Sequence, residues 1–138
     1  MASIHKELEI NAPAEDVWDA VRDIGAVHTR LARQFVIDTQ LDGDSRLVTF
    51  ANGEVVRERI VTMDDHARRL VYAVVDWRTT HHNASFQVVP GDTGCRLVWI
   101  TDLLPDSLAA LVNGFVEQGC VAIRQTLETA RSRQAPVE

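Results

Sequence analysis

The chain has 138 residues, 46% of them hydrophobic and 25% charged, which is ordinary for one globular domain (residues 1–138) with a single core. Its net charge of −6, with scattered basic residues, argues against nucleic-acid binding. No apolar run approaches the ~20 residues that span a bilayer, so we expect no membrane insertion. The start, MASIHKELEI, lacks the basic and apolar blocks of a signal peptide, so we expect a cytoplasmic protein.

The first predicted elements are one strand and two short helical segments. Residues 3–10 alternate between apolar and polar side chains, which is typical of a half-buried strand. A helix follows from Pro13, which suits the first helical position, and acidic residues in its first turn favour the positive end of the helix dipole. Gly25 ends this helix. Residues 26–32 then predict a second short helical segment.

Six further strands are predicted from the alternation and the turn signals that follow. They cover residues 34–41, 46–51, 54–63, 69–77, 81–89 and 95–103. Asn52-Gly53 is the strongest hairpin signal, because both residues tolerate positive φ. As a two-residue loop it pairs Leu47 with Glu58, puts Arg46 on the solvent side, and turns Glu58 toward the concave side. If the loop has another length, the faces of Arg46 and Glu58 stay open.

A long helix closes the chain. From Pro105 to about Arg131 it would be roughly 40 Å long. One face carries an apolar stripe at helical spacing: Leu108, Leu111, Val112, Phe115, Gly119, Ala122, Ile123, Leu127 and Ala130. Such a helix needs a wide apolar surface, and the strands supply one. The predicted fold is α+β, in the order β-α-α-β6-α, with a curved antiparallel sheet around the terminal helix and a pocket between them.

Several strings in this order resemble the SRPBCC superfamily, which includes START-domain and birch-pollen-allergen-like proteins and the polyketide cyclase/dehydrase and lipid-transport proteins. The strings are INAPAEDVWDAVRDI, NGEVVRERI, DDHARRLVYAVV and GCRLVWITDL. The resemblance covers about residues 3–130. It implies a helix-grip fold with a hydrophobic cavity between sheet and helix. Members bind lipids, sterols, polyketides or plant hormones, and a minority catalyse cyclisation or dehydration.

The sequence departs from this family pattern at two histidines. Many small bacterial relatives carry a Trp-His pair near the second short helix, where this chain has His28 and no tryptophan. Relatives often place an aromatic residue at the start of the sixth strand, where this chain has His82, preceded by His81. We therefore expect a pocket that is more polar, or that opens differently, than in its relatives.

The candidate pocket residues combine apolar walls with two polar side chains. The predicted ligand-binding residues are His28, Glu58, Tyr72, His82, Phe86, Trp99, Phe115 and Gly119. His82 shares a strand face with Ala84 and Phe86, and is either a structural hydrogen-bonding residue or a ligand contact. Glu58 is either a ligand or acid/base group or half of a buried structural ion pair. Gly119 either lets the helix approach the sheet or leaves volume for a ligand, and we favour volume.

No sequence motif points to a metal, a cofactor or a phosphate. His81 and His82 point to opposite faces of a strand, which argues against a shared metal. Cys95 and Cys120 lack metal-ligand spacing, and we expect reduced, packed thiols.

Three functions fit this sequence. The first is binding of a small-to-medium hydrophobic ligand of lipid, polyketide or aromatic type. The second is a cyclase or dehydratase in which Glu58 or His82 is the general base. The third is a packed interaction module, which a cavity smaller than ~300 Å³ would favour. Ligand identity, catalytic turnover and a possible homodimeric state stay open.

Overall fold

The computed structural model of the chain describes residues 2–134 and has the predicted order of elements. The helical segments are α1 (Ala14–Arg22), a π-helical turn η1 (Val27–Leu31), a 3-10 turn η2 (Asp106–Leu108) and α2 (Ala109–Gln134). The strands are β1 (Ala2–Ile10), β2 (Val36–Asp42), β3 (Ser45–Phe50), β4 (Val55–Asp64), β5 (Arg69–Val75), β6 (His81–Pro90) and β7 (Cys95–Leu104). Among the described residues no helix is long and apolar enough to cross a membrane.

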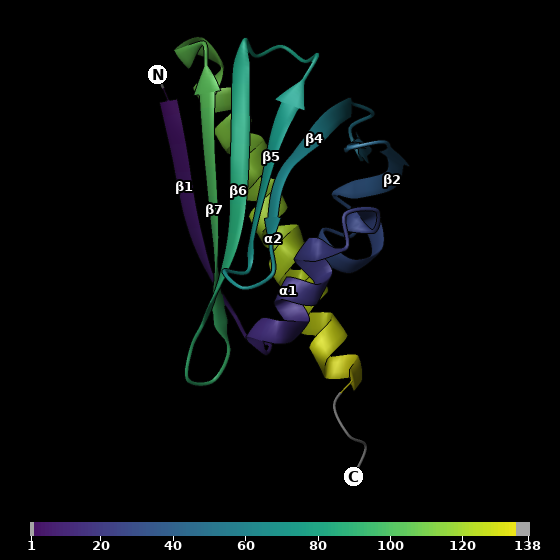
Figure 1. Cartoon of the computed structure of the whole chain (residues 1–138), viewed down its shortest axis with the longest axis vertical. Helices are drawn as coiled ribbons and strands as arrows, with labels where there is room; N and C mark the ends of the chain where they lie inside the picture. Colours follow the sequence, from purple (N-terminus) through teal and green to yellow (C-terminus); the bar gives the residue numbers. More distant parts are fainter. Residues whose placement is uncertain (1, 135–138) are drawn as a thin grey trace.

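The strands form one seven-stranded antiparallel sheet in the order β1-β7-β6-β5-β4-β3-β2. Breaks in register near Ile37 of β2 and Val61 of β4 mark bulges, which bend strands and increase their twist. The sheet curves, and α2 crosses one of its faces from end to end (Figure 1). The predicted helix-grip architecture is therefore confirmed.

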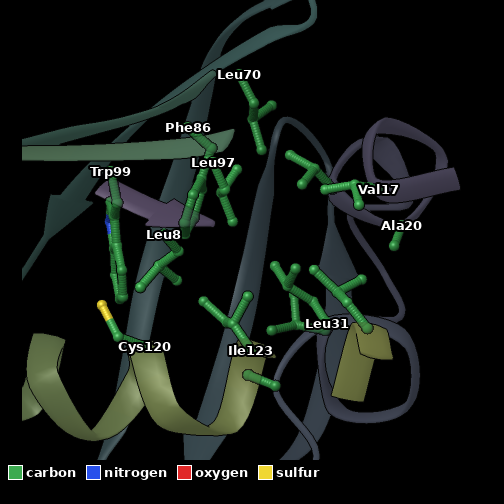
Figure 2. Packing of buried hydrophobic residues seen from close by; sticks show 14 of the residues in the cluster. Leu8, Val17, Ala20, Leu31, Leu70, Phe86, Leu97, Trp99, Cys120 and Ile123 are labelled. Carbon is green, nitrogen blue, oxygen red and sulfur yellow. The ribbon is translucent and has the colours of Figure 1, made fainter. Parts of the chain in front are cut away.

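The core lies between the concave face of the sheet and α2. Alternate residues of the central strands are buried there, among them Leu70 and Tyr72 of β5, Ala84, Phe86 and Val88 of β6, and Leu97 and Trp99 of β7. Figure 2 shows Phe86 and Trp99 pointing from the sheet toward Cys120 and Ile123 of α2. The side chains of Cys95 and Cys120 are buried and form no disulfide.

The apolar stripe of α2 differs from the predicted one at its edges. Leu111 and Ala130 were expected to face the sheet and are exposed. Val116 and Cys120, which the predicted stripe left out, are buried against it. The helix is thus rotated slightly from the orientation in which Leu111 would be buried, and Val112 and Val116 carry the contact at its N-terminal end.

The predicted register of the hairpin between β3 and β4 is wrong by one residue. Phe50 N–H donates to Glu54 O (2.8 Å) and Gly53 N–H donates to Phe50 O (2.9 Å), so the loop has three residues. Gly53 has φ of +92°, as a turn closed by a left-handed glycine requires. Arg46, not Leu47, is therefore paired with Glu58, and Arg46 is buried on the concave face.

The two glycines of α2 give a matched test of how closely helix and sheet pack. A Cβ on Gly119 would lie 2.9 Å from the Trp99 ring and 3.3 Å from Phe35, whereas a Cβ on Gly114 would have no neighbour within 4 Å. We expect Gly119→Ala to destabilise the fold by about 1–3 kcal/mol through overpacking. Gly114→Ala should stabilise it by about 0.5–1 kcal/mol through helix propensity. Urea unfolding measures both, and a stabilising Gly119→Ala would contradict the tight contact.

Candidate functional site

A pocket of about 80 Å³ lies between the concave face of the sheet and the N-terminal half of α2. Its walls are mostly apolar. They comprise Phe35, Phe50, Asn52, Glu54, Val56, Glu58, Tyr72, Val74, Trp77, His82, Trp99, Thr101, Val112, Phe115 and Val116. A second hollow of about 50 Å³, called the inner hollow here in contrast to the first, outer one, is lined mostly by buried residues, among them Arg46, Phe86, Gly119 and Ile123. Phe35, Phe50, Glu58, Tyr72 and Trp99 border both hollows and separate them.

Three aromatic rings form a continuous stacked layer, in which Tyr72 and Trp99 border both hollows and Phe86 borders the inner one. Phe86 stacks on Trp99 with ring centroids 4.7 Å apart and on Tyr72 with centroids 6.1 Å apart. Strands β5, β6 and β7 place these rings side by side, because Tyr72 is paired with Ala84, and Phe86 with Trp99. Rings stacked on one another cover each other's faces, so their edges contribute apolar surface to the walls.

A buried ion pair closes the inner end of this layer. Arg46 Nε donates to Glu58 Oε1 at 2.8 Å, and the two side chains are only 2% and 10% exposed. Arg46 also donates to the carbonyl oxygen of Ile24 (3.4 Å), and its guanidinium lies 5.3 Å from the centre of the Tyr72 ring. Glu58 faces the interior, as predicted, and its partner is a cation from the neighbouring strand.

Trp77 and its partners form the mouth of the pocket. Trp77 Nε1 donates to Glu54 Oε2 at 3.1 Å, and Arg78 donates to the other oxygen of the same carboxylate. The Trp77 ring lies 6.2 Å from His82 and 6.4 Å from Phe115, measured between ring centroids. The charge of Glu54 is therefore already paired at the entrance.

Two buried polar atoms at the pocket have no hydrogen-bond partner of normal geometry among the described residues. They are Nδ1 of His82 and Nε1 of Trp99. Buried polar groups in proteins are nearly always paired, and an unpaired one costs about 1–3 kcal/mol. Both side chains line the same pocket, so a ligand there could supply the missing partners.

The pocket environment shifts the pKa of two of its groups. Burial, with a smaller contribution from the charge of His81, lowers the pKa of His82 from 6.5 to about 4, so the imidazole is neutral at pH 7. Burial raises the pKa of the Tyr72 hydroxyl well above 10, and the Glu58 carboxylate adds to this, while Arg46 and Trp99 oppose it. The site therefore presents neutral polar groups and no unpaired charge from these two residues.

Comparison with known proteins establishes the family. Residues 1–129 match the family described as polyketide cyclase / dehydrase and lipid transport. The chain belongs to this family. No curated protein is similar enough in sequence to count as a match.

Solved structures similar to this member of the polyketide cyclase/dehydrase family cover nearly the whole chain. A Thermobifida fusca protein is 31% identical, with a TM-score of 0.76 over 97% of this chain and 95% of that one. A START superfamily protein of Mycobacterium smegmatis is 12% identical, with a TM-score of 0.73 over 96% and 99%. Norcoclaurine synthase of Thalictrum flavum, in complex with dopamine and hydroxybenzaldehyde, is 19% identical, with a TM-score of 0.71 over 99% and 89%. The last two show the fold alone.

The structure brings most of the predicted site residues of this family member together. Glu58, Tyr72 and Trp99 border both hollows, His82 and Phe115 line the outer one, and Phe86 lines the inner one. His28 lies elsewhere: its Nδ1 is 3.1 Å from Thr39 Oγ1, and it lines neither hollow.

Two expectations about pocket size need correction. Gly119 was expected to leave volume for a ligand, but the Trp99 ring fills the space beside it. A ligand-binding form was expected to enclose at least ~300 Å³, and the outer hollow measures about 80 Å³. Both differences have one cause, because the large aromatic side chains of the sheet reach across to α2.

Sequence reasoning missed the residues at the pocket mouth. Trp77 is out of phase with Tyr72 and Val74 in a regular strand, but Asp76 has φ of +57° and breaks the alternation. Phe50 and Glu54 reach the pocket through the three-residue loop. The single tryptophan at the end of the fifth predicted strand, Trp77, offered a signal, but the alternation placed it on the opposite face.

The low pKa of His82 predicts a pH-dependent stability. Its pKa in the folded state (about 4) is below the unfolded value (6.5), so the unfolded chain binds more protons between these pH values. Above pH 6.5 the imidazole is neutral in both states and does not lower the free energy of unfolding. As the pH falls from 6.5 toward 4, protonation of the unfolded chain lowers the free energy of unfolding. We expect His82→Gln to lose less unfolding free energy than the wild type between pH 7 and pH 5. An NMR titration midpoint for His82 near 6.5 would contradict this.

The burial of Arg46 and Glu58 predicts a large cost for breaking their pair. Arg46→Met leaves a buried carboxylate without its cation, and we expect a loss of about 3–5 kcal/mol in urea unfolding. Adding Glu58→Leu should recover most of it. Arg57 and Asp42 have a similar N···O distance of 2.9 Å but are 33% and 61% exposed, so Arg57→Met should cost under ~1 kcal/mol. Equal costs for Arg46→Met and Arg57→Met would contradict the ranking.

Proposed function

We propose that this protein binds a small hydrophobic molecule in the pocket between the sheet and α2. The observation that carries the proposal is the pair of unpartnered polar atoms, Trp99 Nε1 and His82 Nδ1, inside mostly apolar walls. An apolar pocket with few oriented polar groups is the common form of a small-molecule site. Such groups fix the orientation of a ligand whose body is held by the walls.

The volume of the pocket limits how the ligand is held. A cavity of about 150 Å³ is known to hold one benzene molecule, and the two hollows are each smaller than that, at about 80 Å³ and 50 Å³. Binding therefore requires the side chains between the hollows to move. Phe35 and Phe50, an edge-to-face pair 5.2 Å apart, are the uncharged members of that boundary outside the stacked layer. We propose that they move and join the hollows.

Among the ligand types considered, lipid, polyketide and aromatic, the walls favour the aromatic one. The stacked layer of Tyr72, Phe86 and Trp99 presents ring edges, and ring edges attract the face of an aromatic ligand in edge-to-face contact. Norcoclaurine synthase, which shares the fold, has been solved with dopamine and hydroxybenzaldehyde, both aromatic molecules. A cytoplasmic location and a homodimeric state stay predictions.

The enzyme alternative, a polyketide cyclase or dehydratase, has less support from the site. One Glu58 oxygen is engaged by Arg46 at 2.8 Å, and the general-base role needs a carboxylate free to accept a proton. A His82 pKa of about 4 makes that imidazole a weak base at neutral pH. Turnover that Glu58→Gln abolishes, with binding retained, would favour the enzyme.

The interaction-module alternative is supported by the small volume of the pocket. A module without a ligand has no use for buried polar atoms that lack partners, and these atoms favour the binding proposal. The ligand-binding proposal and the interaction-module alternative make different predictions for a variant in which a larger side chain fills the pocket.

Filling the pocket from α2 tests the proposal. Val112 lines the pocket, whereas Val121 is 60% exposed on the solvent side of the same helix. After incubation with a small-molecule extract of cells, native mass spectrometry should show an added mass on the wild type and on Val121→Phe. Val112→Phe should lose it, because the larger ring occupies the cavity. An added mass retained by Val112→Phe, or absent from the wild type, would contradict the proposal.

A further inference from the structure

The three tryptophans of the chain differ in what their indole N–H groups contact. Trp18 Nε1 donates to Asp65 Oδ1 at 2.9 Å, and Trp77 Nε1 donates to Glu54 Oε2 at 3.1 Å. Trp99 Nε1 is buried and has no partner of normal hydrogen-bond geometry in the described part of the chain, in a residue only 9% exposed. The indole N–H groups of Trp18 and Trp77 are thus hydrogen-bonded, whereas that of Trp99, at the pocket wall, is not.

The neighbours of Trp99 explain why its N–H stays open. The ring is held between Phe86, 4.7 Å away by centroids, and the backbone of Gly119, so it has little freedom to turn. The Tyr72 hydroxyl is an acceptor inside the protein close to this N–H: a weak hydrogen bond from the Trp99 side chain opposes the burial that raises the pKa of Tyr72, but the contact falls outside the geometry of a normal hydrogen bond. An indole N–H can only donate, so the group it lacks is an acceptor.

The charged groups at the pocket indicate which acceptor fits. Glu58 is paired with Arg46 and Glu54 with Arg78, and both carboxylates line the cavity. The remaining titratable side chains of the wall, Tyr72 and His82, are neutral at pH 7. A ligand carboxylate would therefore bury its charge beside two carboxylates without gaining a cation, which is costly.

We propose that the ligand is an aromatic molecule with an uncharged oxygen, a hydroxyl or a carbonyl, that accepts a hydrogen bond from Trp99 Nε1. This inference rests on the proposed function and names the ligand group that the site selects. His82 lies four residues along β6 from the residue paired with Trp99, about 13 Å away along the strand. His82 would therefore contact a different part of the ligand, nearer the pocket mouth at Trp77.

The three indoles provide their own controls in an NMR experiment. The ¹⁵N-labelled full chain is titrated with phenol, toluene and benzoate, and the indole N–H signals are assigned with single Trp→Phe variants. Phenol should move the Trp99 signal downfield, as a new hydrogen bond does, and move the Trp18 and Trp77 signals much less. Toluene should bind without that downfield shift. Benzoate should bind at least about tenfold more weakly than phenol.

Affinity ratios separate the hydrogen bond from the apolar contact. In Trp99→Phe the ratio of phenol to toluene affinity should fall about fivefold to tenfold, the effect of one buried hydrogen bond. The ratio is informative even though the smaller ring enlarges the cavity, since both probes gain that space. Phenol and toluene moving the Trp99 signal alike, or an unchanged ratio in Trp99→Phe, would overturn the inference and leave the proposed function standing.

The Tyr72→Phe variant tests whether the Tyr72 hydroxyl accepts a hydrogen bond from the Trp99 indole in the ligand-free protein. If the Tyr72 hydroxyl already accepts from Trp99, the Trp99 indole signal of the ligand-free variant will move upfield, and the inference is overturned. An unmoved signal supports it. Failure of all three probes to bind the wild type would instead contradict the proposed function itself.

Discussion

The buried pair of Arg46 and Glu58 is the interaction on which the concave face depends. A guanidinium that is 2% exposed is stable in an apolar interior only when a carboxylate and further acceptors meet it. Glu58 and the carbonyl oxygen of Ile24 are such acceptors. The three-residue loop at Gly53 sets the register that pairs Arg46 with Glu58. A two-residue loop would have turned Arg46 to solvent and left Glu58 buried alone.

The ion pair is linked to α2 through a chain of ring contacts. Arg46 lies over Tyr72, Tyr72 stacks on Phe86, and Phe86 stacks on Trp99. The Trp99 ring then meets the backbone of α2 at Gly119, where a single added methyl group would overlap it. The position of the helix over the sheet is thus fixed by side chains that also form the pocket walls. The proposed ligand site and the packing of the helix therefore share the same residues, and the remaining free volume is small.

The sequence predicted the strands to within two residues, because alternation and turn residues are local signals. It did not predict the pairing at Asn52-Gly53, because a two-residue and a three-residue loop can both use this dipeptide. Trp77 was missed because Asp76 takes a left-handed conformation that interrupts the alternation. Gly119 was misinterpreted for a different reason. An absent side chain looks the same whether the space holds a ligand or a ring, and only Trp99, twenty residues away in sequence, decides between them.

The choice of tryptophan at position 99 helps to distinguish a ligand-binding pocket from a packed core without a ligand. In a packed core, phenylalanine can stack on Phe86 as tryptophan does, and it has no polar atom to bury. Trp99 instead keeps an N–H without a partner, at a cost of about 1–3 kcal/mol. The wider ring adds apolar area, which offsets part of that cost at about 25 cal/mol per Å². The indole nitrogen itself, however, gains nothing from the fold. Its place on the pocket wall is explained if its acceptor arrives with a bound molecule.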